Sequence, residues 1–118
     1  MLIFQKPEKI NSTNIQAEFY RQCVENNISV HLEYKHECSR FDAVVYDKVT
    51  KEILFIIEIK SYKVPQRPNV YTKQIYKYRQ YNIPVIIVGR GEKVKDAVLF
   101  IRRSIDSEER DLPGIIPF

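Results

Sequence analysis

Three charged residues stand in segments that otherwise have the composition of buried β-strands. Glu58 and Lys60 close an apolar run that begins at Ile53, and Asp42 lies within the strand-like segment 40–47, next to Ala43, Val44 and Val45. Charged side chains are rarely buried in a strand unless they have a partner or a function. Because residues two apart in a strand point to the same face, we expect Glu58 and Lys60 to project together from one face of a sheet.

The polar segment 48–52 predicts a turn that folds these two strands into a hairpin. If the turn is centred on Thr50, residues whose numbers add up to 100 face each other, and Asp42 lies directly opposite Glu58. Cross-strand neighbours have Cβ atoms about 5 Å apart, and two like charges at that spacing are destabilising. A divalent cation between them removes the repulsion, and carboxylate oxygens suit Mg²⁺.

Two carboxylates, a cation and an ammonium group provide what phosphodiester hydrolysis needs. A bound Mg²⁺ polarises a phosphate and lowers the pKa of an attacking water, and the ammonium of Lys60 stabilises negative charge that develops in the transition state. The simpler alternative is an ion pair between Lys60 and the two acids, with no catalytic role.

The rest of the chain has the patterns of an α/β fold. Asn11 to Asn14 offer N-caps for a helix that runs to about residue 26. Strands are expected at 28–37, 40–47, 53–61 and 84–88, a helix from about 69 or 72 to 81, and a C-terminal helix over about 94–105. In the first strand, Ile28, Val30, Leu32 and Tyr34 should share one side. The sequence predicts a single domain over residues 1–118, with one mixed sheet flanked by helices.

The motifs resemble those of a known family. Asp42 followed by Glu58-Ile59-Lys60 resembles the signature of the PD-(D/E)XK nuclease superfamily, which includes restriction enzymes, resolvases and some homing endonucleases. Glu18 matches that family's helix-borne glutamate, and Gln74-x-x-x-Tyr78 resembles its glutamine-tyrosine motif. The resemblance spans roughly residues 13–90. One departure is Phe41, which precedes Asp42 where the signature has proline.

The resemblance implies a restriction-endonuclease-like core of order α-β-β-β-α-β and a metal-dependent endonuclease acting on DNA. Asp42, Glu58 and the Ile59 carbonyl would bind Mg²⁺, with Mn²⁺ as a substitute, and Lys60 would position or activate the water. Glu18 would assist through a second metal or through solvent, and its alternative is an exposed helix acid. Gln74 would orient the site or contact the phosphate backbone, and its alternative is an ordinary polar helix residue.

Basic residues are concentrated in one part of the chain. Residues 60–103 carry eleven basic and two acidic residues, although the net charge of the whole chain is only +4. This asymmetry is expected if one surface meets phosphates, and it is weak evidence by itself because basic residues also solvate helix faces. The residues expected to bind nucleic acid are Lys63, Arg67, Lys73 and Lys77.

The remaining expectations concern location and assembly. Cys23 and Cys38 lack the spacing of a zinc site and fit reduced thiols, and no membrane span or signal peptide is evident, so we expect a cytoplasmic protein. Cutting both strands of duplex or branched DNA favours a homodimer or higher homo-oligomer. Two alternatives stay open: a catalytically inactive nucleic-acid-binding module, and an interaction subunit of a larger DNA-processing complex. The apolar tail 115–118 would pack on the domain or bind such a partner.

Overall fold

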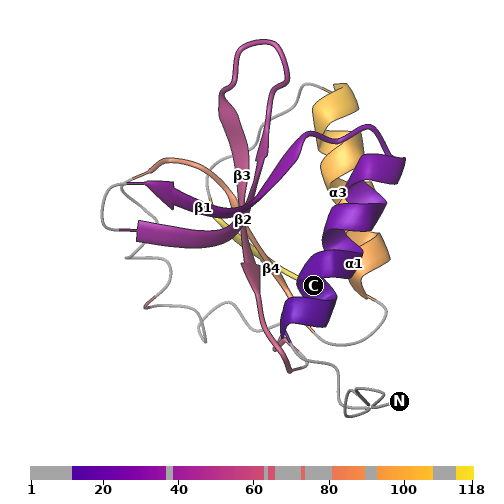
Figure 1. Ribbon diagram of the computed structural model, residues 1–118, viewed down its shortest axis with the longest axis vertical. Coiled ribbons are helices and arrows are strands. Elements are labelled where there is room, and N and C mark those ends of the chain that lie inside the picture. Colours follow the sequence, from indigo (N-terminus) through magenta and orange to yellow (C-terminus); the bar gives the residue numbers. More distant parts are fainter. Residues whose placement is uncertain are drawn as a thin grey trace, which may run out of the picture.

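The computed structural model describes residues 12–36, 39–62, 64–65, 73, 81–89, 93–107 and 114–118. Along the chain, these residues form a helix, four strands, a second helix and a short final strand (Figure 1). The elements are α1 (Ser12–Glu25), β1 (Val30–His36), β2 (Ser39–Tyr46), β3 (Ile53–Ile59), β4 (Val85–Val88), α3 (Lys93–Ser107) and β5 (Ile115–Pro117).

The described strands form one mixed sheet in the order β1-β2-β3-β4-β5. β1, β2 and β3 are antiparallel neighbours, whereas β4 runs parallel to β3 and β5 runs parallel to β4. The predicted mixed α/β sheet is confirmed, and so is the central place of the β2–β3 hairpin. The tail packs on the domain as β5, a strand that the sequence did not predict.

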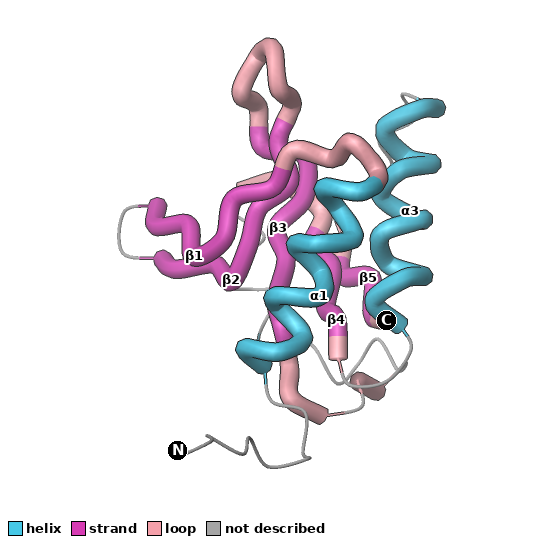
Figure 2. Tube along the Cα trace, turned by 45° about the vertical axis from the view of Figure 1, so that its right-hand side comes forward, coloured by secondary structure: helices cyan, strands magenta, loops and turns pink. Residues whose placement is uncertain are grey.

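Helices α1 and α3 lie side by side against one face of the sheet, here called the helix face (Figures 1 and 2). The apolar side of α1 contributes Ile15, Phe19 and Cys23 to the core, and that of α3 contributes Val94, Ala97, Val98 and Ile101. They meet odd-numbered residues of the central strands, which are Ala43, Val45, Phe55, Ile57 and Ile59. This layer buries the larger of the two apolar clusters.

The opposite side, here called the second face, carries a smaller apolar cluster. Its buried members are Phe41, Val44, Ile56, Val64, Val85 and Ile87, with Tyr34, Ile53, Tyr81, Ile83 and Ile115 packed around them. Apolar residues on both faces explain why the central strands read as continuous apolar runs rather than alternating ones. The prediction that the hairpin is apolar on both sides is confirmed.

Helix α1 ends in a Schellman motif. The Ile28 amide donates to the Cys23 carbonyl and the Asn27 amide to the Val24 carbonyl, while Asn27 adopts a left-handed conformation with φ of 57°. Arg102 of α3 donates to the carbonyls of Asn26 and Asn27, at 3.0 and 3.1 Å. One of the basic residues counted in the sequence therefore joins the two helices.

The β2–β3 register matches the prediction over its middle part. Ala43 faces Ile57, Val44 faces Ile56 and Val45 faces Phe55, so each pair of numbers adds up to 100. Next to the turn the prediction is wrong by one residue, because Tyr46 pairs with Ile53 and leaves Leu54 as a bulge. The Asp47 carboxylate accepts the amides of Val49 and Thr50, and this bonding shapes the turn.

Strand β1 changes face at Glu33, which has a left-handed φ of 54°. Val30 and Leu32 pack on the helix face, whereas Tyr34 packs on the second face. The expectation that Tyr34 shares a side with Leu32 is therefore wrong, since a strand residue in this conformation disrupts the regular alternation.

The predicted helix at 69–81 lies almost wholly outside the described residues, although Lys73 is helical. Among the described residues, no helix is long and apolar enough to cross a membrane.

Candidate active site

The Asp42 carboxylate lies between strands β2 and β3. In the described part of this hairpin, regular backbone pairing ends with Ala43 and Ile57, and beyond this pair the Asp42 side chain makes the next hydrogen bond. Asp42 Oδ2 accepts the backbone amide of Ile59 at 2.7 Å. The amides of Ile56 and Lys60 donate to the carbonyls of Pro84, just before β4, and of Val88, at the end of β4. The Ile59 amide therefore faces the other neighbour, β2. The carboxylate thus takes the place of a backbone acceptor from β2.

The backbone of Asp42 is held from the other side by helix α1. Gln16 Nε2 donates to the Asp42 carbonyl at 2.8 Å. The β1–β2 register passes from Leu32–Ala43 to Tyr34–Phe41, and Glu33, the residue opposite Asp42, has the left-handed φ noted above. Gln16 therefore supplies a donor where regular pairing with β1 is interrupted. Asp42 is fixed through both its carbonyl and its carboxylate.

Glu58 and Lys60 project from the second face of the sheet, because Ile56 lies in that face's cluster and side chains alternate along a strand. Lys60 Nζ lies 3.5 Å from Glu58 Oε2. Only 12% of the Glu58 side chain and 26% of the Lys60 side chain are exposed. Both charges are therefore partly withdrawn from solvent, which strengthens their interaction with each other and with any charged group that enters the site.

The four residues Asp42, Glu58, Ile59 and Lys60 form what we call the open end of the hairpin. The structure brings together the two predicted acids, the predicted carbonyl ligand and the lysine over a short stretch of two neighbouring strands. In an extended strand, the carbonyl of a residue points to the same neighbouring strand as its amide, so the Ile59 carbonyl faces the Asp42 side.

The donor atoms at the open end suit a hard divalent cation. Among the described residues, no three His, Cys, Asp or Glu side chains gather closely enough to hold a metal ion by themselves. A metal site here would use the carboxylates of Asp42 and Glu58 with the carbonyl of Ile59, an all-oxygen set that leaves positions for water. Mg²⁺ usually binds proteins through one or two carboxylates and keeps several waters, so the residues fit it.

Glu18 lies on a different flank of helix α1 from Gln16. The two residues are two positions apart, which places them about 200° apart around the helix axis. The Glu18 carboxylate accepts hydrogen bonds from Arg21 and Gln22, and its side chain is 41% exposed. These bonds, led by the one from Arg21, hold the pKa of Glu18 below its usual value. None of these described contacts leads to the open end of the hairpin, and the catalytic role of Glu18 stays a prediction.

Several predicted residues lie outside the described part of the chain. Gln74, Lys63, Arg67 and Lys77 are among them, so their predicted roles are not placed in the fold. Lys73 is described as helical and exposed, as a phosphate-binding lysine requires.

Gly89 brings the end of β4 against the segment that follows Lys60. A Cβ atom at this position would collide with the Tyr62 carbonyl and with the Val64 side chain. Only glycine therefore allows this close approach, which helps to fix the chain directly after the lysine. The Gly89 amide also donates to the Phe118 carbonyl at 3.2 Å, so the tail contributes to the same corner.

Sequence reasoning missed Gln16. Its signal was its place beside Ile15 and three residues before Phe19, at the border of the buried stripe of the helix, where a polar side chain can reach a neighbouring strand.

Comparisons of the chain with protein-family models, with curated proteins and with solved structures give no match. The sheet, the open end of the hairpin and the sequence motifs are therefore the basis for assigning a function.

Proposed function

We propose that the protein is a Mg²⁺-dependent endonuclease of the PD-(D/E)XK type, with a restriction-endonuclease-like fold, that hydrolyses phosphodiester bonds in DNA. Asp42, Glu58 and the Ile59 carbonyl hold the metal ion, and Lys60 acts on the attacking water. The observation that carries the proposal is the bond from the Ile59 amide to the Asp42 carboxylate. It fixes the first acid beside the backbone that joins the second acid to the lysine.

The bonding of Asp42 prepares its carboxylate for this role. Oδ2 is occupied by the Ile59 amide, so the carboxylate is oriented before any ligand arrives. Gln16 holds the carbonyl of the same residue and limits movement of the strand. Fixing a ligand in advance lowers the cost of organising the site during the reaction. When bound, Mg²⁺ polarises the phosphate and lowers the pKa of a coordinated water.

Glu58 and Lys60 divide the remaining tasks. Glu58 supplies the second carboxylate and also neutralises the ammonium of Lys60, whose Nζ lies 3.5 Å away. Lys60 donates hydrogen bonds to the water or to the phosphate oxygens and stabilises the negative charge that builds up there. Because both side chains are largely shielded from solvent, this stabilisation is stronger than it would be on an open surface.

The test is cleavage of supercoiled, linear, branched and single-stranded DNA, with and without Mg²⁺. We expect metal-dependent cleavage of at least one substrate. Lys60→Ala should reduce the rate by about 100- to 1,000-fold, the usual cost of removing a group that stabilises transition-state charge. Lys95→Ala is the matched control, because Lys95 is an exposed lysine of α3 and lies outside the site.

Folding of each variant is checked by circular dichroism and thermal unfolding. Cleavage at the wild-type rate in a folded Lys60→Ala variant would exclude the site. DNA binding without cleavage of any substrate would instead favour the inactive binding module. The tail offers less support for an interaction subunit, because β5 pairs with β4 and the Phe118 amide donates to the Ile87 carbonyl at 2.7 Å.

A further inference from the structure

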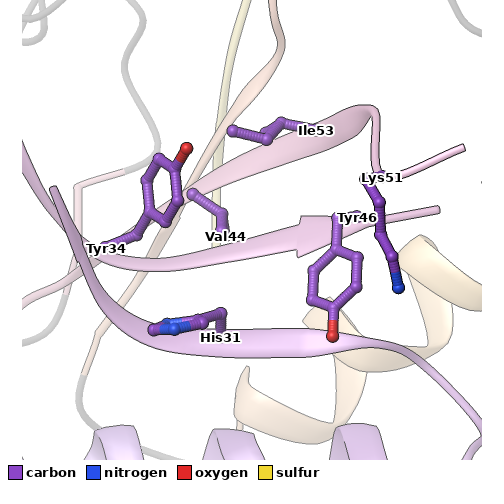
Figure 3. Close-up of a pocket in the computed structure, with 6 residues that line it drawn as sticks. All are labelled: His31, Tyr34, Val44, Tyr46, Lys51 and Ile53. Carbon is purple, nitrogen blue, oxygen red and sulfur yellow. The ribbon is translucent and has the colours of Figure 1, made fainter. Parts of the chain in front are cut away.

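A pocket of about 220 Å³ lies on the second face of the sheet, beside the β2–β3 turn (Figure 3). Its lining residues come from β1, β2, β3 and the turn, and they are His31, Tyr34, Val44, Tyr46, Lys51 and Ile53. The volume is smaller than the roughly 300–1,000 Å³ of pockets for drug-sized molecules. A single planar ring system therefore fits the pocket better than a larger metabolite does.

The walls of the pocket are aromatic, and two of them are fixed in place. The Tyr34 ring stacks on Phe41 behind it, with ring centroids 6.4 Å apart and an interplanar angle of 11°. The His31 ring meets Tyr34 edge-on at 6.0 Å, and its Nδ1 lies 2.8 Å from the Leu32 carbonyl. Val44 lies between Tyr34 and Tyr46, and Ile53 adds a second apolar side chain to the lining (Figure 3). Such a pocket favours a flat, partly apolar ligand that stacks.

A positive charge borders the aromatic walls. Lys51 Nζ lies 5.8 Å from the centroid of the Tyr46 ring, and the Lys51 side chain is exposed. An ammonium group beside stacking rings matches the chemistry of a nucleotide, whose base is planar and whose phosphate is anionic. The pocket shares the second face with Glu58 and Lys60, and Val44 is only two residues, about 7 Å, from Asp42 along β2.

We propose that this pocket binds an unpaired nucleobase of the DNA strand that enters the active site. The base stacks against Tyr46 and Tyr34, and Lys51 contacts the adjoining phosphate. This inference rests on the proposed nuclease function and adds a substrate preference, because a base can enter the pocket only when it is not paired in a duplex. The preferred substrate then carries a single-stranded or branched segment next to the cleaved bond.

The test measures binding of a fluorescent oligothymidylate to the full chain by anisotropy, in the presence of EDTA so that no cleavage occurs. We expect Tyr46→Ala to weaken binding by about 5- to 150-fold, the range found when a base-stacking aromatic residue is replaced by alanine. Tyr46→Phe keeps the ring and should bind within about twofold of wild type. Tyr20→Ala is the control, because it removes an exposed tyrosine from α1, on the other side of the sheet.

Lys51 gives a second readout, from an exposed side chain of the turn. Lys51→Ala should lower the slope of log affinity against log salt by roughly 0.7, as expected for the loss of one contact between a cation and a single-stranded phosphate. Lys48→Ala, at another exposed lysine of the same turn that does not line the pocket, should leave the slope unchanged.

The outcomes separate this proposal from the proposed function. Three results would each overturn the base pocket. The wild-type chain fails to bind oligothymidylate, Tyr46→Ala binds it as tightly as wild type does, or duplex DNA binds as tightly as single-stranded DNA. Metal-dependent cleavage that depends on Lys60 would still support the nuclease in all three cases. Conversely, ring-dependent binding in EDTA together with no cleavage in Mg²⁺ would keep the pocket and reject the catalytic role.

Discussion

The two halves of the β2–β3 hairpin use the same strands for different purposes. In the paired half, residues 43–45 face residues 55–57, and every side chain there is buried and apolar. At the open end, regular pairing gives way to a bond between a backbone amide and the Asp42 carboxylate. The first half combines regular pairing with apolar packing on both faces, whereas the ladder is interrupted in the second half, where the charged side chains lie.

The largest expected effect is on the DNA cleavage that we propose for the open end. Asp42→Asn retains an oxygen that can accept the Ile59 amide, so the fold should survive while the negative charge is lost. We expect DNA cleavage to fall by about 100- to 1,000-fold, with a change in unfolding free energy below about 1 kcal/mol. Initial rates and urea unfolding measure the two effects. A stability loss as large as that of a core variant would remove the distinction between the two halves.

The paired half should respond in the opposite way. Ile56 is fully buried in the second-face cluster, and Ile56→Ala leaves a cavity there. The expected loss of unfolding free energy is about 2–5 kcal/mol, again measured in urea. Cleavage by the fraction that remains folded at low temperature should stay near the wild-type rate. A selective loss of activity in fully folded Ile56→Ala would mean that packing in this half directly sets the geometry of the site.

Gln16 connects the open end to helix α1 and should show an intermediate effect. Gln16→Met keeps the size of the side chain but removes the donor to the Asp42 carbonyl. We expect the Mg²⁺ concentration for half-maximal cleavage to rise by about 10- to 100-fold, as when a residue that supports a metal ligand is lost. A change confined to thermal stability, with no shift in the Mg²⁺ requirement, would assign Gln16 a purely structural role.

Cys23 of α1, buried against the helix face of the sheet, should make the free energy of unfolding depend on pH above about pH 9. Burial raises the pKa of Cys23 from 9.0 to about 12. The thiol is neutral in both states below pH 9, so it has no effect there; above pH 9 the unfolded state loses the proton more readily, and the folded state becomes relatively less stable. The expected loss between pH 7 and pH 10 is about 1.4 kcal/mol. Comparing the pH dependence of urea unfolding with that of Cys23→Ala isolates this contribution.

The smallest effect is expected for Glu18. Its carboxylate is engaged by Arg21 and Gln22 on an exposed flank of α1, so Glu18→Ala should change the cleavage rate by less than about threefold. Arg21→Ala releases the carboxylate and provides the companion variant. A rate loss in Glu18→Ala comparable to that of Lys60→Ala would support the role that the sequence motif predicted and extend the proposed site to the helix.

The sequence predicted the pairing in the middle of the β2–β3 hairpin correctly, but not the pairing next to the turn or the contact at the open end. The composition of residues 48–52 was enough to place the turn, and the pairing of Val44 with Ile56 followed from it. The bulge at Leu54 was not predictable from composition, because the turn beside it is also held by hydrogen bonds from backbone amides to the Asp47 carboxylate. Similarly, the expected facing of Asp42 and Glu58 took a regular ladder for granted, whereas the Asp42 side chain itself replaces a rung of it.

Two other features had no clear signal in the sequence. Strand β5 contains Pro117 and follows Gly114, a composition that argues against a strand. It can still form because β5 pairs with β4 along one side, and proline is tolerated in a strand at the edge of a sheet. The Gln16 contact depends on the distance between a helix and a strand that are separated by 26 residues. The pattern of apolar residues locates a helix face, but it does not tell which polar side chain at its border reaches a particular carbonyl.

The left-handed conformation of Glu33 has a consequence for self-association. β1 is an edge strand of the described sheet, and the edge of a sheet is a template on which a strand from another molecule can add. The irregular backbone at Glu33 and the exposed charges of Lys35 and Glu33 itself make β1 a poor template. Uncontrolled growth of intermolecular sheets is thereby discouraged along this edge.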